Sequence, residues 1–138
     1  MKEFVFIFRN SNTPADAPSP EQMQQSMTDW MNWFGSIAAQ NKLANNGNRL
    51  SASSAKTIKP DNTVSDGPYT EIKEFIQGYI IVKTADINEA VELAKGCPIL
   101  KEGGNVEVRA VVTMNDNSWS PFILNEKHFN LKRINKFI

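Results

Sequence analysis

The longest regular pattern in the sequence is a stripe of large apolar residues, three or four positions apart, that runs through residues 19–43. This spacing places the stripe on one face of an α-helix. Ser19 and Gln22 can form a capping box around Pro20, which suits the first helical position. Two interpretations of the apolar face remain: it packs on a sheet, or it forms the wall of a pocket for an apolar ligand. The stripe consists of Met23, Met27, Trp30, Phe34 and Ile37, widened by Met31, Trp33 and Ala38.

Three segments have the composition of β-strands. Residues 2–9 and 77–84 are rich in apolar side chains on both alternate sets, which is typical of strands covered on both faces. Residues 106–113 alternate instead, so that Glu107 and Arg109 share the face opposite the first two valines. This alternation predicts a half-buried strand, and it leaves open whether Arg109 faces a cavity or solvent.

The connections between these segments carry turn and capping signals. The run Asn-Asn-Gly-Asn at 45–48 is interpreted as a turn that ends the long helix. A short hairpin is predicted where residues 55–58 and 63–65 flank a Pro-Asp-Asn turn. A second helix is predicted to begin at Asp86, which has a glutamate three residues later, and to end at Gly96.

The predicted order is strand, long helix, hairpin or strand pair, strand, short helix, strand. Two β–α–β units of this kind give an α+β fold, a ferredoxin-like split βαβ sandwich whose helices cover one face of the sheet. The other face carries apolar side chains and needs a cover of its own. A second copy of the chain is the simplest cover, because a two-fold pair needs only one self-complementary surface. We therefore expect a homodimer.

Charge and composition narrow the classes of function. Fifteen basic residues balance fifteen acidic ones, so the chain has no basic surplus to displace counterions from phosphates, and we expect no nucleic-acid partner. The single cysteine, Cys97, cannot form an internal disulfide and is interpreted as a packing residue. The only histidine, His128, leaves no zinc-binding spacing, so we expect neither a metal nor a cofactor. No segment approaches the ~20 apolar residues of a membrane span, and no signal peptide is recognisable, so we expect a cytoplasmic protein with no membrane partner.

The C-terminal segment differs from the rest of the chain. The β–α–β pattern occupies residues 1–114, whereas residues 115–138 combine a polar linker with many apolar side chains, among them Trp119, Phe122 and Phe129. Because so much apolar surface is unfavourable in water, we expect this tail to pack on the body or on the partner subunit.

A series of short motifs follows between residues 66 and 109. In order, they are Asp66-Gly67-Pro68-Tyr69, then Glu71, Lys73 and Glu74, then Gly78-Tyr79, Cys97-Pro98, Gly103-Gly104 and Val106-Glu107-Val108-Arg109. Their succession resembles the YCII-related family, whose members often carry a DGPF motif. Tyr69 stands where that motif has Phe. The resemblance extends over residues 1–112.

The resemblance implies a dimeric α/β barrel, in which two ferredoxin-like subunits face their sheets together. Some related proteins carry a His–Asp pair proposed to be catalytic. The resemblance supplies no such pair here, because His128 lies beyond the matching region.

Four residues are candidates for ligand binding. Asp66 is either a turn residue or a carboxylate at the mouth of the cavity between the two sheets, where it would accept a proton or orient a polar ligand. Tyr69 and Glu71 follow in the same motif, and Glu71 also fits an ordinary exposed ion pair. Arg109 is the best anion-binding group if its face lines the barrel.

Three functions are compatible with these features. The first is a binding protein that holds a small polar or anionic ligand in the cavity between subunits. The second is a cofactor-free enzyme that uses Asp66 or Glu71 as an acid or base. The third is a structural or regulatory module whose tail docks on another protein.

Overall fold

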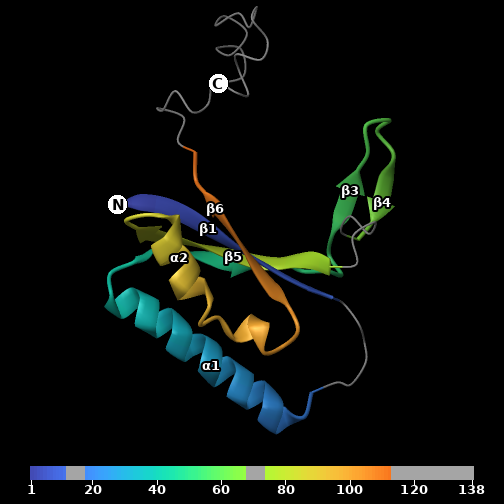
Figure 1. Cartoon of the computed structure of the whole chain (residues 1–138). Helices are drawn as coiled ribbons and strands as arrows, with labels where there is room; N and C mark the ends of the chain where they lie inside the picture. The colour runs from blue at the N-terminus through green and yellow to red at the C-terminus, as the bar shows by residue number, and fades with distance from the viewer. Residues whose placement is uncertain (12–17, 68–73, 113–138) are drawn as a thin grey trace, which may run out of the picture.

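A computed structural model describes residues 1–11, 18–67 and 74–112 of the 138-residue chain. It contains a four-stranded sheet with helices on one side and a separate two-stranded sheet that stands away from them (Figure 1). In chain order the elements are β1 (Lys2–Ser11), α1 (Pro20–Ala39), β2 (Leu43–Arg49), β3 (Lys56–Ile58), β4 (Val64–Asp66), β5 (Glu74–Thr84), α2 (Ile87–Ala94), the short 3-10 helix η1 (Pro98–Leu100) and β6 (Asn105–Ala110).

The four-stranded sheet has the order β2-β5-β1-β6, and its neighbouring strands are antiparallel. Each β–α–β unit is therefore split: β5 lies between β1 and β2, and β1 lies between β5 and β6. The predicted α+β class is confirmed, and this strand order is compatible with the predicted ferredoxin-like fold.

The core lies between one face of this sheet and the two α-helices. Alternate residues of β1 and β5 point toward the helices, with Phe6 and Ile80 completely buried at the centre. On the helix side, Trp33 and Ile37 of α1 are buried, and the Trp33 indole N–H donates to the carbonyl of Leu93 at 3.0 Å. The core consists of Phe4, Phe6, Phe8, Trp33, Ile37, Ile80, Val82, Ala90, Ala94, Cys97 and Ile99.

The long helix begins as predicted and ends earlier. Ser19 and Gln22 form both hydrogen bonds of the capping box. Asn41, at φ 59°, then reverses the chain, and Lys42 N–H donates to the carbonyl of Ile37 at 3.1 Å, as in a Schellman motif. The predicted extension of the helix to residue 43 is therefore wrong. The turn predicted at 45–48 is instead part of β2, an edge strand with two irregularities in its register.

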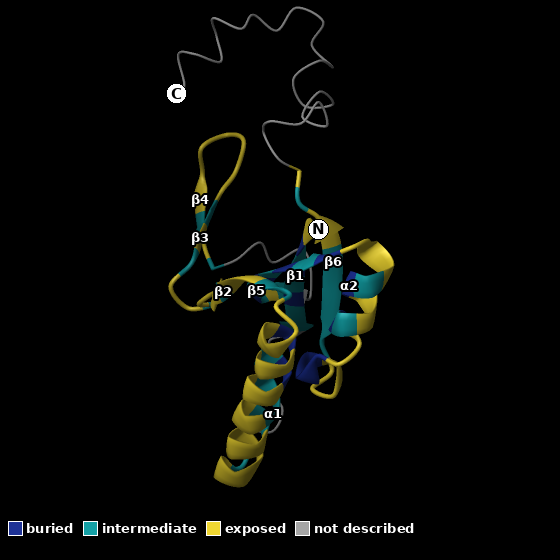
Figure 2. Cartoon of the chain, turned by 90° about the vertical axis from the view of Figure 1, so that its left-hand side faces the viewer, coloured by how far each residue is buried: buried dark blue, intermediate teal, exposed yellow. Residues whose placement is uncertain are grey.

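The predicted hairpin is confirmed, but it is not the second strand of the main sheet. Its strands β3 and β4 pair with one another in a sheet of their own. Figures 1 and 2 show this hairpin projecting from the four-stranded sheet on the side away from α1 and α2.

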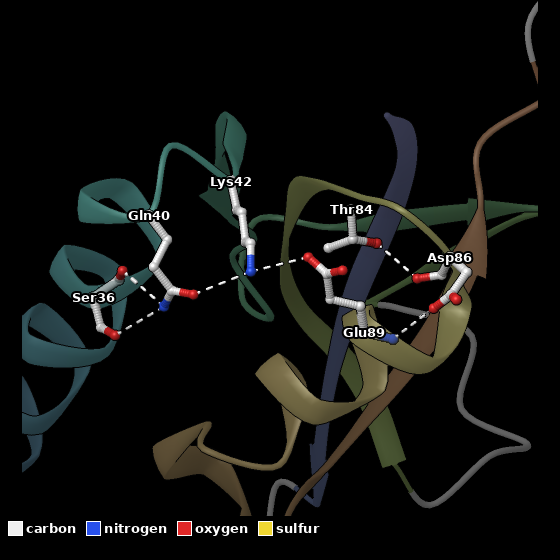
Figure 3. A network of polar contacts seen from close by, with 6 residues as sticks. All are labelled: Ser36, Gln40, Lys42, Thr84, Asp86 and Glu89. Carbon is white, nitrogen blue, oxygen red and sulfur yellow. Dashed lines mark hydrogen bonds and ion pairs between the residues drawn. The ribbon is translucent and has the colours of Figure 1, made fainter.

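A network of polar contacts joins the end of α1 to the start of α2 (Figure 3). Lys42 Nζ lies 2.9 Å from Glu89 Oε1 and also donates to Gln40 Oε1 at 3.2 Å. The Asp86 carboxylate caps α2 by accepting from Glu89 N–H at 2.9 Å. The C-terminal end of α1 is therefore fixed to α2, whereas its N-terminal half extends beyond the sheet and is largely exposed (Figure 2).

Among the described helices, none is long and apolar enough to cross a bilayer. The C-terminal segment 115–138 lies outside the described residues, so its packing stays a prediction.

Candidate functional site

A pocket of about 460 Å³ lies between α1 and the edge of the sheet formed by β2 and β5. This volume is in the range of sites that enclose small organic ligands, about 300–1,000 Å³. One wall belongs to α1 and includes Met27, Trp30, Met31 and Phe34. These residues belong to the apolar stripe for which the sequence allowed two interpretations, packing on a sheet or forming the wall of a ligand pocket.

The stripe of α1 divides into two parts. Trp33 and Ile37 pack into the core, whereas Met27 and Met31 are 60% and 69% exposed. Unbranched methionine side chains adapt to irregular apolar partners, which makes them suitable for a binding wall. Sheet packing is therefore confirmed for Trp33 and Ile37, whereas Met27 and Met31 line a pocket and an apolar ligand there stays a prediction.

Aromatic rings form the inner part of the pocket. Phe8 meets Trp30 edge-on, with ring centroids 5.2 Å apart, and Trp30 lies 5.8 Å from Phe34. Such ring contacts add about 0.5–1.5 kcal/mol each to simple burial. Because these rings also contact the core residue Trp33, they are held in place before any ligand arrives.

The opposite wall is formed partly by backbone atoms, because it contains two glycines in adjacent strands, Gly47 of β2 and Gly78 of β5. Gly47 has φ +64°, and a Cβ there would lie 1.6 Å from the carbonyl oxygen of Tyr79. A Cβ on Gly78 would lie 2.6 Å from the carbonyl oxygen of Asn48. The irregular part of β2 therefore approaches β5 closely, and Gly78 contributes no side chain to the pocket.

The rim of the pocket carries a cationic side chain, Arg49. Arg49 is paired with Gly78 across the two strands, so its side chain leaves the sheet on the helix side, where the pocket lies. It is exposed and makes no ion pair within the described part of the chain. At the other end Ser26 donates a hydrogen bond to Glu102, and Gln77 also lines the pocket. The pocket thus combines an apolar interior with a guanidinium group at its rim.

The face of the four-stranded sheet opposite the helices is a second surface of interest. Its centre consists of two half-buried cross-strand pairs, Val5 with Ile81 and Ile7 with Tyr79. No element of the described residues lies across this face (Figures 1 and 2). We call these four side chains the open-face patch.

The structure resolves the question of which way Arg109 faces. Glu107 and Arg109 pair with Ile7 and Val5 of β1, so both side chains lie on the open face, whereas Val106 and Val108 face the helices. Glu107 accepts a hydrogen bond from Arg9 and also lies 3.7 Å from Arg109 Nε. A row of two guanidinium groups and one carboxylate therefore borders the open-face patch.

Asp66 lies elsewhere, at the end of β4 in the projecting hairpin. Its side chain is 91% exposed and lies 2.7 Å from Lys56 Nζ. No contact joins Asp66 to Arg109 among the residues whose structure is described. Tyr69 and Glu71 fall outside the described residues. A shared site for these four candidates between two subunits stays a prediction.

Two pocket residues, Arg49 of β2 and Gln77 of β5, were not singled out from the sequence, and Gly78 and Tyr79 were noted only as part of a motif series. Arg49 and Gln77 follow no motif, and the Asn-Asn-Gly-Asn run was interpreted as a turn. The one signal that could have found the pocket was the length of the apolar stripe, which continues beyond the part of α1 that a small sheet can cover.

In a comparison with protein-family models, residues 4–115 match the YCII-related domain. A search of curated proteins gives no match.

Proposed function

The chain belongs to the YCII-related family, and we propose that it is a small-molecule-binding protein whose ligand has an apolar, aromatic or chain-like body and an anionic end. The proposed site is the pocket between α1 and the β2–β5 edge. The observation that carries the proposal is an apolar pocket of about 460 Å³ with Arg49 at its rim, a guanidinium that forms no ion pair with any described residue.

The apolar part of the proposed ligand follows from the walls. Phe8, Trp30 and Phe34 offer ring faces and edges, and Met27 and Met31 offer flexible apolar contacts. Phe8 is buried, whereas Trp30, Phe34 and the two methionines are at least partly exposed. Contact with an apolar body would remove that exposed surface from water at about 25 cal/mol per Å².

The anionic part follows from the charge at the rim. Arg49 can form a charge-assisted, bidentate contact with a carboxylate or similar group. Ser26 holds Glu102 at the other end, so the negative charge of the pocket lies away from Arg49. An anion would therefore bind with its charged group toward Arg49 and its apolar body along α1.

Two fluorescent probes test this assignment. 8-Anilinonaphthalene-1-sulfonate has aromatic rings and a negative charge, whereas N-phenyl-1-naphthylamine is its uncharged counterpart. Because a hydrogen bond to a charged group contributes about 1.5–3 kcal/mol, we expect Arg49→Gln to weaken sulfonate binding about tenfold or more and to leave the uncharged probe unaffected. Met27→Gln combined with Met31→Gln should weaken both probes, because both lose the apolar wall.

Arg109→Gln is the matched control, since it removes the same charge from the open face. It should leave both dissociation constants unchanged in fluorescence titrations. If Arg109→Gln weakens sulfonate binding and Arg49→Gln does not, the anion binds on the open face and the proposed pocket is wrong.

We also propose that the protein acts as a homodimer in which the open-face patches of two copies meet, giving the barrel arrangement expected of the family. The apolar pairs Val5–Ile81 and Ile7–Tyr79 support this, as does the absence of a covering element in the described residues. Sedimentation at micromolar concentration should give twice the 15.5 kDa chain mass. Ile81→Lys should give the monomer, because it places an unpaired charge in the contact.

A further inference from the structure

The projecting hairpin has an inverted distribution of apolar and polar side chains. Ile58 and Val64 are cross-strand partners at the end of the ladder, and they are 71% and 56% exposed. The hydroxyl residues Thr57 and Ser65 form the next pair, point to the other face and are less exposed. The hairpin therefore presents its apolar pair outward.

This hairpin has little to stabilise it within the described chain. Among the described strands, its two strands of three residues each pair only with one another, in a sheet separate from the main one. The side-chain contacts that support it are local: Lys56 with Asp66, and Thr57 donating to the carbonyl of Gly67 at 2.9 Å. An isolated two-stranded hairpin is at best marginally stable in water, so a well-formed one with an exposed apolar pair indicates an additional contact surface.

The position of the hairpin identifies what that surface meets. It rises on the same side of the main sheet as the open-face patch (Figures 1 and 2). From its base, where Gly67 N–H donates to the carbonyl of Ala55, to the pair Ile58–Val64 is three residues, or about 10 Å at 3.3 Å per residue. Two sheets packed face to face also lie about 10 Å apart. The apolar pair therefore stands off the base of the hairpin by about the spacing of two packed sheets.

We propose that the β3–β4 hairpin is an arm that contacts a second copy of the chain, with Ile58 and Val64 packed on the edge of the partner's four-stranded sheet. The inference rests on the proposed homodimer. A single partner then covers both the open-face patch and the arm. Under a two-fold axis, the arm of each copy packs on the sheet of the other, so the two contacts are equivalent.

The charge on the arm fits this contact. The face that carries Ile58 and Val64 also carries Lys56 and Asp66, which neutralise each other at 2.7 Å. The contacting face of the arm therefore has no net charge from its strands, and it presents its apolar pair without a repulsive charge toward an identical chain.

A cross-linking experiment on the full-length protein tests the arm directly. Ile58 is replaced by photo-reactive p-benzoylphenylalanine, and ¹⁴N- and ¹⁵N-labelled protein is mixed before irradiation. We expect mixed-isotope cross-links from position 58 to the main sheet of the other copy. Cross-links confined to the same chain, including those to residues 113–138, overturn the proposal.

A double substitution measures the contribution of the arm. Ile58→Thr with Val64→Thr keeps the β-branched side chains that strands favour and removes the apolar contact. We expect the dimer dissociation constant to rise at least tenfold. The control is Leu100→Thr, which changes another exposed apolar side chain, 45% exposed, on η1 in the helix layer and should leave dimerisation unchanged.

Ile81→Lys separates the arm from the dimer itself. If Ile81→Lys dissociates the dimer and the hairpin substitutions have no effect, the proposed arm contact is wrong and the sheet-to-sheet dimer is supported. If the unmodified protein is a monomer at micromolar concentration, the dimer fails and the arm with it. Ligand binding in the pocket is measured separately and is not affected by either result.

Discussion

Gly47 fixes the shape of the pocket at the level of a single residue. Its φ of +64° lies in the left-handed region, and the space where a Cβ would lie is occupied by the backbone of Tyr79. A side chain at this position must therefore push β2 away from β5. The close approach of β2 to β5 at the far wall of the pocket therefore requires that residue 47 has no side chain, as it does for Gly78.

Gly47→Ala should consequently destabilise the protein by at least 2 kcal/mol, on the order of other changes that combine backbone strain with a steric clash. Gly35→Ala is the matched control, because Gly35 lies within α1 and has nothing within 4 Å of its Cβ position. Alanine there should raise stability by about 0.5–1 kcal/mol. Urea unfolding of the two variants measures both effects, and equal stability of the two would show that the approach of β2 to β5 is not tight.

Cys97 is buried among the core residues, and burial raises the pKa of its thiol to about 12 from the usual 9.0. We expect Ellman's reagent to react with the folded protein far more slowly at pH 8 than with protein unfolded in urea, since only the thiolate reacts. Rapid reaction of the folded protein would contradict the buried position.

The same shift predicts a pH dependence of stability. Because the folded pKa is raised, the folded state keeps its proton between pH 9 and about 12 while the unfolded state loses it. The stabilisation is therefore complete below pH 9 and is lost as pH rises toward 12. Between pH 8 and pH 10 the unmodified protein should lose more unfolding free energy than Cys97→Ala, which lacks this group.

Single residues also show where sequence reasoning was limited. The alternation of β6 correctly placed Glu107 and Arg109 on one face, because strand periodicity fixes relative direction. It could not decide what that face meets, which depends on the strand order. Arg49 was missed for a related reason. Its position at the rim depends on the approach of α1 to β2, and a local sequence pattern does not show that these two segments lie close together.

At the scale of elements, α1 and β2 illustrate what local signals can predict. The start of α1 was predictable because a capping box is a contact within four residues. Its end was not, because Asn41 takes the left-handed conformation that a glycine would have signalled more clearly. The polar strand β2 has almost no apolar alternation, and it is a strand because its backbone bonds to β5.

The capping box gives a prediction for α1. Ser19→Ala removes the hydroxyl that accepts from Gln22 N–H at 3.1 Å, and it should cost about 1 kcal/mol of stability. Thr28→Ala is the control within the same helix, because its exposed hydroxyl bonds only to the carbonyl of Gln24 and alanine is the better helix former. Thermal unfolding should therefore show a lower midpoint for Ser19→Ala and an unchanged or higher midpoint for Thr28→Ala.

At the scale of the whole molecule, the sequence predicted the α+β class and the two β–α–β units, because each unit is a local succession of patterns. It assigned the hairpin to the main sheet, although the hairpin forms a sheet of its own, because the number of residues between two elements does not show which strands pair. The pocket could not be predicted from the sequence for the same reason, because it lies between elements that only the tertiary structure brings together.

The last prediction concerns the tail, residues 115–138, and what its apolar side chains cover. Burying a large side chain such as Phe122 or Phe129 stabilises by about 1.5–3 kcal/mol, while ordering the backbone costs about 1–2 kcal/mol per residue. The tail therefore orders only if most of its apolar residues are buried together. We expect the chain truncated after residue 117 to be less soluble or to unfold at a lower temperature than the full-length protein, because the surface beneath the tail becomes exposed. Unchanged solubility and melting temperature, with rapid proteolysis of the tail in the intact chain, would show instead that the tail is free to bind another partner.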